Sequence, residues 1–105
     1  MLKIIGCFLD SGTWIFGPPM KGKKSNVGCA TFLNEDNIPT IVVGGGFYDM
    51  KLLENTEFLI DGSTEWIDGP NLPRKTKDTN LVRLPNNQGL VMIGGMGSTA
   101  GKPSC

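Results

Sequence analysis

Short apolar runs alternate with polar clusters along most of this chain, and each run is too short for a buried helix. The polar clusters are rich in Asn, Asp, Gly and Ser, which favour turns and disfavour strands. The runs in the middle of the chain cover residues 27–33, 38–45, 55–60 and 65–68. They predict two hairpins, one turning at Asn34–Asn37 and one at Asp61–Thr64, where Asp-Gly supplies a positive φ. We therefore expect four strands in an up-and-down antiparallel meander.

The same order of runs continues on both sides of this meander. Downstream, two more strands are expected at 79–84 and 90–95, around a turn at Pro85–Gly89. Upstream, residues 4–9 and 13–16 have the pattern of the last two strands of a preceding unit. Within the meander, a polar loop is expected from residue 47 to about 52. No window shows a sustained 3.6-residue period, so no helix is expected.

Two of the predicted strands are continuously apolar rather than alternating. Ile41–Val43 and Leu90–Ile93 carry no polar position on either face. Strands of this kind are covered on both sides. The pattern therefore predicts small sheets stacked face to face.

Landmark residues recur at a nearly constant interval. Trp14 and Trp66 lie 52 positions apart and each is followed by Gly-Pro, while the pairs Gly44-Gly45 and Gly94-Gly95 lie 50 apart. A period of this length is typical of solenoids and propellers, whose units cannot bury their apolar faces alone. The division that follows is half of a preceding unit at 1–20, one complete unit at 21–72, half of the next unit at 73–97 and a tail at 98–105.

Composition agrees with an all-β chain and narrows the function classes. Fifteen glycines and seven prolines among 105 residues suit many short strands joined by turns. With ten basic and ten acidic residues there is no net basic field, so nucleic acid is not an expected partner. Histidine is absent, which removes the commonest general base and transition-metal ligand. We expect no cofactor, no metal and no catalytic site.

Cysteine usage and hydropathy give no sign of a covalent framework or of a membrane segment. The three cysteines are an odd number without metal-ligand spacing, so they read as incidental or buried thiols. No run approaches the roughly 20 apolar residues that span a bilayer, and the apolar run before Asp10 is short for a signal peptide. A soluble chain with no membrane partner is expected, and its compartment stays open.

The landmarks together resemble the Kelch repeat. An apolar strand ending in Gly44-Gly45 is followed by Thr56–Leu59 and then by Trp66 with Gly69–Arg74, and Ile93–Gly95 begins a second copy. The resemblance covers nearly the whole chain. It implies four-stranded antiparallel blades of a Kelch-type β-propeller, incomplete in this chain, and a protein or peptide as partner.

In that reading the glycine pairs and the tryptophans have structural roles. The glycines admit a positive φ or a close approach of backbones, and the indole ring of Trp66 fills the space between blades. Propellers close with four to eight blades, so two blade equivalents need further blades in cis or self-association. We expect the chain to be a fragment of a longer protein.

Basic residues gather in the segments that join one unit to the next. In an up-and-down meander these segments open on the same face as the loop between the second and third strands, which places Tyr48 and Asp49 there too. The basic residues concerned are Lys21, Lys23, Lys24, Arg74, Lys75 and Lys77. The hairpin turns open on the other face and carry Asp10, Glu35, Asp36, Asp61 and Glu65. This basic face predicts an acidic peptide or protein as partner, although solvated loop charges would have the same pattern.

Two alternatives remain open. The chain could belong to a propeller enzyme of the galactose-oxidase or sugar-processing kind, with the catalytic residues outside it, or it could be a purely structural scaffold segment. Carboxylates such as Glu35-Asp36, or Glu54 with Glu57, could act as acid and base, but we expect them to be solvated.

Overall fold

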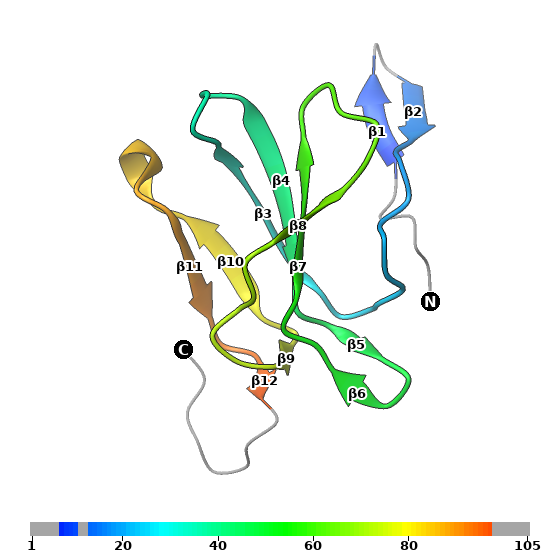
Figure 1. Cartoon of the computed structure of the whole chain (residues 1–105), viewed down its shortest axis with the longest axis vertical. Helices are drawn as coiled ribbons and strands as arrows, with labels where there is room; N and C mark the ends of the chain where they lie inside the picture. The colour runs from blue at the N-terminus through cyan, green and yellow to red at the C-terminus, as the bar shows by residue number, and fades with distance from the viewer. Residues whose placement is uncertain (1–6, 11–12, 98–105) are drawn as a thin grey trace.

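The computed structural model describes residues 7–10 and 13–97, and side chains from residue 17 onwards with the exception of Asn87. It is built of antiparallel strands, as the sequence predicts, with a single turn of 3-10 helix at Pro85–Asn87 inside the expected turn. Part of the predicted first strand, residues 4–6, and the tail 98–105 lie outside the described residues. The described part of the chain is therefore all-β (Figure 1).

A four-stranded sheet forms the centre of the molecule. Its strands follow one another in the order β3-β4-β7-β8. Their bounds are Gly28–Leu33, Pro39–Gly44, Thr56–Ile60 and Ile67–Gly69. The predicted meander is confirmed, and its last strand begins two residues later than expected because a turn centred on Ser63 extends to Glu65 through the Ser63 hydroxyl.

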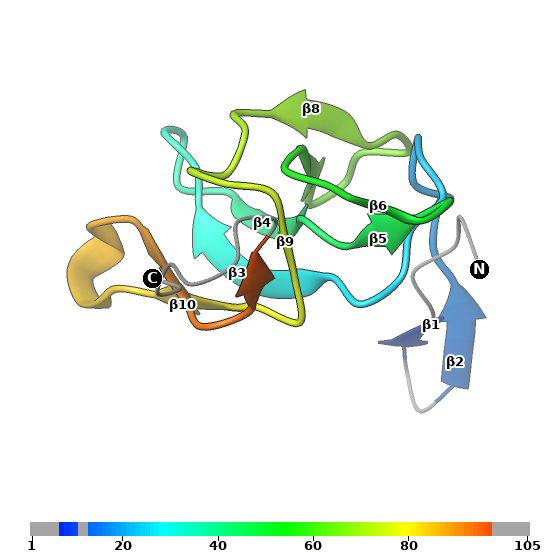
Figure 2. The same cartoon turned by 90° about the horizontal axis from the view of Figure 1, so that it is seen from below.

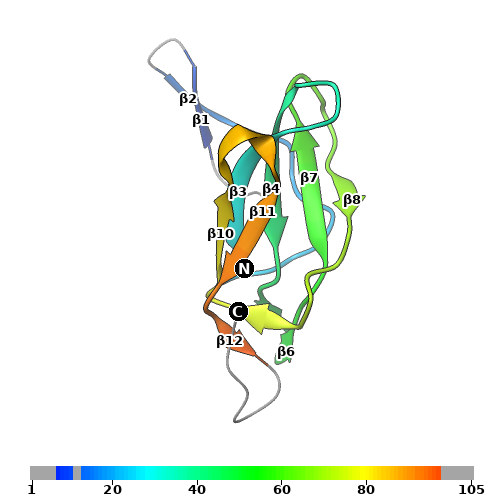
Figure 3. The same cartoon turned by 90° about the vertical axis from the view of Figure 1, so that its left-hand side faces the viewer.

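Two-stranded sheets flank this central sheet on opposite sides, as the two views in Figures 1 and 2 show. β1 (Cys7–Asp10) pairs with β2 (Thr13–Phe16) on one side. β10 (Asn80–Arg83) pairs with β11 (Leu90–Ile93) on the other and lies beside β3. Figure 3 shows β10 and β11 in front of the central sheet as a second layer.

Four very short strands complete the fold at the end opposite the hairpin turns. β5 (Phe47–Tyr48) pairs with β6 (Lys51–Leu52), and β9 (Thr76–Lys77) pairs with β12 (Met96–Gly97). The sequence predicts only a polar loop here. Strands of two residues carry no recognisable side-chain period, so pattern alone does not reveal them.

The repeat is visible in the backbone as well as in the sequence. Asn26 and Asp78, 52 positions apart, both adopt a left-handed conformation, with φ of 56° and 57°. The bridge between Ser25 and Phe47 has its counterpart in the pairing of Lys77 with Met96. These equivalences align Gly45-Gly46 with Gly94-Gly95, and all four have positive φ. The sequence analysis matches Gly94-Gly95 with Gly44-Gly45, 50 positions earlier. In the structure its counterpart is Gly45-Gly46, 49 positions earlier, because Gly44 still belongs to β4.

Two clusters of apolar side chains cover the two faces of the central sheet. On the face toward β1 and β2, Trp66 packs with Met20, Val43 and Leu59. On the face toward β10 and β11, Val42 packs with Leu81 and Met92. Burial on both faces is confirmed for β4.

The same prediction is wrong for β11. Met92 is buried, but Ile93 remains 49% exposed. No layer of the described residues lies against the outer face of β11, and Ile93 on that face is therefore open to solvent.

Candidate functional site

The end of the molecule that carries the short strands gathers most of the basic residues predicted to face a partner. Backbone hydrogen bonds join the two inter-unit segments to β5 and to the residue before it: Phe47 N donates to Ser25 O at 2.8 Å, and Gly46 N donates to Thr76 O at 2.8 Å. Asp78 N also donates to Asn26 O at 2.9 Å. The sequence-based prediction that these loops share one end is confirmed. We call this region the loop end, comprising residues 21–26, 46–55 and 71–78.

A tight hairpin projects from the loop end. Asp49 and Met50 form its two-residue turn between β5 and β6, with φ of 53° and 64°. Positive φ at both central positions is typical of a type I′ turn, which matches the twist of the flanking strands. In such a turn Asn, Asp or Gly is usual at the first central position and Gly at the second, since most other side chains in the left-handed region cost roughly 1–2 kcal/mol. The chain instead places a methionine there, and this side chain is 86% exposed.

A groove lies beside this hairpin. It has a volume of about 660 Å³ and combines apolar with charged and amide side chains. Its lining residues are Met50, Lys51, Leu52, Leu53, Glu54, Asn55, Asn71 and Lys75. Lys51, which the sequence analysis did not single out, therefore faces the same groove as the predicted Lys75. No sequence signal placed it there, because β6 was not foreseen.

The predicted basic residues have different environments in the structure. Lys23 and Lys75 are exposed, as is Tyr48. The ammonium group of Lys21 lies 2.9 Å from the carboxylate of Asp68, an exposed ion pair. Lys77 Nζ lies 4.8 Å from the centre of the Phe47 ring, a cation–π contact that holds β9 against β5.

Arg74 and Asp49 complete the predicted set. Arg74 is half-buried, and its guanidinium occupies the space next to Gly97 of β12. Asp49 is exposed in the hairpin turn. Both lie at the loop end, but Arg74 is partly covered by the β9–β12 pair.

Lys24 is a correction to the predicted basic face. Its side chain is 1% exposed, and its Nζ lies 2.8 Å from Oε2 of Glu57, which is 1% exposed as well. The expectation that Glu57 is solvated is wrong for the same reason. A charge removed from water needs a partner of opposite charge, and Lys24 and Glu57 are each other's partner.

Backbone amides complete the surroundings of Glu57. Lys21 N donates to Oε1 at 2.7 Å and Gly22 N donates to Oε2 at 3.2 Å. Burial raises the pKa of Glu57, but the hydrogen bonds and charge of Lys24, together with these two amides, outweigh burial and hold the pKa below its ordinary value of 4.5. A signal was present in the sequence: Glu57 has the same strand parity as Leu59, so an alternating pattern places it on the covered face.

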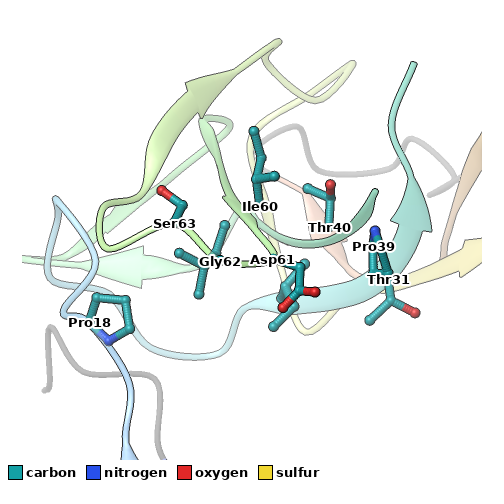
Figure 4. Close-up of a pocket in the computed structure, with 10 residues that line it drawn as sticks. Pro18, Thr31, Pro39, Thr40, Ile60, Asp61, Gly62 and Ser63 are labelled. Carbon is teal, nitrogen blue, oxygen red and sulfur yellow. The ribbon is translucent and has the colours of Figure 1, made fainter. Parts of the chain in front are cut away.

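A second cavity lies at the opposite end, above the face of the central sheet that turns toward β1 and β2 (Figure 4). Its volume is about 290 Å³. The floor is a row of three paired residues, Thr31, Ile41 and Leu59, and Pro18 faces them from the segment after β2. Among its described lining Asp61 is the ionisable residue, so this cavity offers apolar surface and not a reacting pair.

The structural landmarks of the sequence analysis have the following environments. Trp66 is buried, and its indole N–H donates to Pro18 O at 2.9 Å, which ties the residue just before β8 to the segment between β2 and β3. Trp14 lies in β2, but its side chain is outside the described set. A Cβ on Gly45 would lie 2.7 Å from Thr76 O, so the glycine permits the close approach that the sequence predicts. Gly94 also has a positive φ, but nothing lies within 4 Å of a Cβ built there.

Within 7–10 and 13–97, no group of three or more His, Cys, Asp or Glu side chains could hold a metal ion. In the same residues no helix is long and apolar enough to cross a membrane. Comparison with protein-family models and with curated proteins found no match for this chain.

Proposed function

We propose that this chain is a non-enzymatic protein-interaction module, a partial Kelch-type β-propeller whose loop end binds an acidic segment of a partner protein. The central unit supports the Kelch assignment: it combines a four-stranded meander, a glycine pair with positive φ and a buried tryptophan, in the order that the family implies. The loop end supports the binding role through its exposed side chains.

The observation that carries the proposal is Met50. A long apolar side chain that is 86% exposed, at a position with φ of 64°, is unfavourable twice over for the isolated chain. Backbone strain of this kind concentrates at ligand-binding and switch sites. A partner that covers Met50 removes its apolar side chain from water. This gain is a physical reason for a methionine at this position.

The groove beside Met50 indicates the chemistry of the partner. Lys51 and Lys75 both line this groove, together with Leu52 and Leu53. A segment that alternates acidic with apolar residues places carboxylates near the ammonium groups and apolar side chains on Met50. Charge-assisted hydrogen bonds of this type contribute about 1.5–3 kcal/mol each.

Binding of a short fluorescent peptide of alternating glutamate and leucine, measured by anisotropy at low salt, tests the proposal. Lys75→Glu is expected to weaken binding about tenfold, which equals about 1.4 kcal/mol. Arg83→Glu is the matched control, because Arg83 is exposed on β10 away from the groove and the change in charge is the same. Equal affinities of the wild type and both variants would overturn the proposal.

A further inference from the structure

The two small sheets at the sides of the molecule are complementary halves of one larger sheet. β10 and β11 correspond to β3 and β4: Asn80 pairs with Ile93 as Gly28 pairs with Gly44. Equivalent residues are 52 positions apart in the sequence for the first strand and 49 positions apart for the second. This half contains the first two strands of a unit.

β1 and β2 correspond in the same way to β7 and β8. Trp14 and Trp66 are equivalent, and so are Ile15 and Ile67. Phe8 pairs with Ile15, and Phe58 pairs with Ile67, so Phe8 is the counterpart of Phe58. This half therefore contains the last two strands of a unit, with a hairpin two residues shorter than that of the central sheet.

These halves cannot meet within one chain, because they lie on opposite sides of the central sheet (Figures 1 and 2). In the described part of the chain β11 pairs with β10 alone, and β1 pairs with β2 alone. The edges by which β4 and β7 pair in the central sheet are thus unpaired in their counterparts, β11 and β1. An unpaired edge is a template for pairing with another chain.

The faces of the molecule are complementary as well as the edges. On the outer face of β10 and β11, Val82 is 44% exposed. Its counterpart in the central sheet, Ala30, packs against the Val42–Leu81–Met92 cluster. The face that such a layer would cover on another copy is the one above Thr31, Ile41 and Leu59, where the apolar cavity of Figure 4 lies.

A comparison of two cavities supports this match. A smaller cavity of about 150 Å³ lies between the central sheet and β10–β11, and its lining includes Pro70 and Leu90. The larger cavity has their counterparts, Pro18 and Ile41, in its lining. The two cavities therefore lie at equivalent places on successive layers. In the smaller cavity, Val42 and Phe58 of the preceding layer form the opposite wall.

We propose that copies of this chain associate head to tail, with β11 of one copy pairing antiparallel with β1 of the next. Translating the β4–β7 register by the repeat places Val91 opposite Phe8, Leu90 opposite Leu9 and Met92 opposite Cys7. The strands β10, β11, β1 and β2 then form one four-stranded sheet like the central one. The contact is heterologous, so it closes a ring or extends an open array.

Site-specific cross-linking tests this register. In a background without the native cysteines (Cys7→Ser, Cys29→Ser, Cys105→Ser), a Phe8→Cys chain is mixed with a Val91→Cys chain and oxidised. Directly opposed residues of an antiparallel pair have Cα atoms about 4.5–5.5 Å apart, within the range of a disulfide. A mixed disulfide dimer is expected on a non-reducing gel.

Val82→Cys is the matched control, since Val82 is the Cα partner of Val91 on β10, one strand further from the new edge. Its distance from Phe8 across two strand spacings is about 10 Å, too long for a disulfide. The mixed dimer should therefore be lost when Val82→Cys replaces Val91→Cys. No mixed dimer with Val91→Cys, or equal amounts with both, would overturn the proposal.

Light scattering on the unmodified chain is the second measurement. Particle masses at multiples of the 11.3 kDa chain that grow with concentration are expected. A monomer at every concentration overturns the proposal even if the cysteine variants fail to fold. Peptide binding at the loop end is not needed for either result, so this proposal and the proposed function fail independently.

Discussion

At the scale of single residues, the buried ion pair of Lys24 and Glu57 links two distant parts of the chain. It joins an inter-unit segment to β7, and two backbone amides complete it. A buried ion pair of this kind is costly to break, since the remaining charge is left in a region without water.

Lys24→Met is expected to lower the free energy of unfolding by about 3–5 kcal/mol, because it leaves the carboxylate of Glu57 without its partner charge. The double variant Lys24→Met/Glu57→Leu removes both charges and should recover most of the loss. Urea denaturation followed by tryptophan fluorescence measures both. A double variant less stable than the single one would contradict the assignment of the loss to the unpaired charge.

The same carboxylate makes stability depend on pH. Its pKa is lower in the folded chain than its ordinary value of 4.5, so the unfolded chain binds the proton more readily. This contribution is fully present above pH 4.5 and is lost as the pH falls through the lower, folded-state pKa. The drop in melting temperature on acidification should be smaller in Glu57→Gln than in the wild type; equal drops would mean that Glu57 is not the group responsible.

At Gly46 both the backbone conformation and the lack of space for a side chain favour glycine. Its φ is 110°, and a Cβ there would lie 2.7 Å from Ser25 O. Gly62 has a φ of 86° and no atom within 4 Å of its Cβ position. Gly62→Ala should cost about 1 kcal/mol from conformation alone, and Gly46→Ala clearly more. Similar losses in thermal denaturation would show that the close approach carries no cost.

At the scale of elements, the β5–β6 hairpin is built for presentation more than for stability. Its strands have two residues each, and its turn carries Met50 at the second central position, where the left-handed backbone favours glycine. Such a hairpin is stable here because β5 is also hydrogen-bonded to the segment at Ser25.

Met50→Gly therefore separates the two roles of this position. It should raise the free energy of unfolding by about 1 kcal/mol, since the left-handed strain is relieved. It should also weaken binding of the glutamate–leucine peptide, because the apolar contact is lost. Calorimetry and anisotropy give the two values, and tighter peptide binding by the glycine variant would count against the role of Met50.

At the scale of the whole molecule, the layers are held together by a few side chains that bridge successive units. Trp66 is the largest of them: it fills the cluster with Met20 and Val43, and its N–H reaches Pro18. Such bridges decide whether the layers unfold together.

Trp66→Ala is expected to destabilise the chain by about 3–5 kcal/mol. Trp66→Phe keeps an aromatic ring but loses the bond to Pro18, and should cost less. A cooperative melt with an unchanged midpoint in the alanine variant would contradict the bridging role.

The sequence by itself determined the longer strands, the two central hairpin turns and the repeat. These depend on local features: β-branched runs, Asp-Gly and Pro-Asn turns, and tryptophans at a fixed interval. Each acts over a few residues, so pattern is sufficient to find it.

Tertiary structure alone decided the rest. It buried Lys24 against Glu57, 33 positions away, brought Lys51 to the same groove as Lys75, and left β11 half covered. These outcomes depend on which distant backbone segments come together and on how many layers are present. A side chain's type gives no information about either, and for that reason a lysine predicted to face a partner could become part of the core.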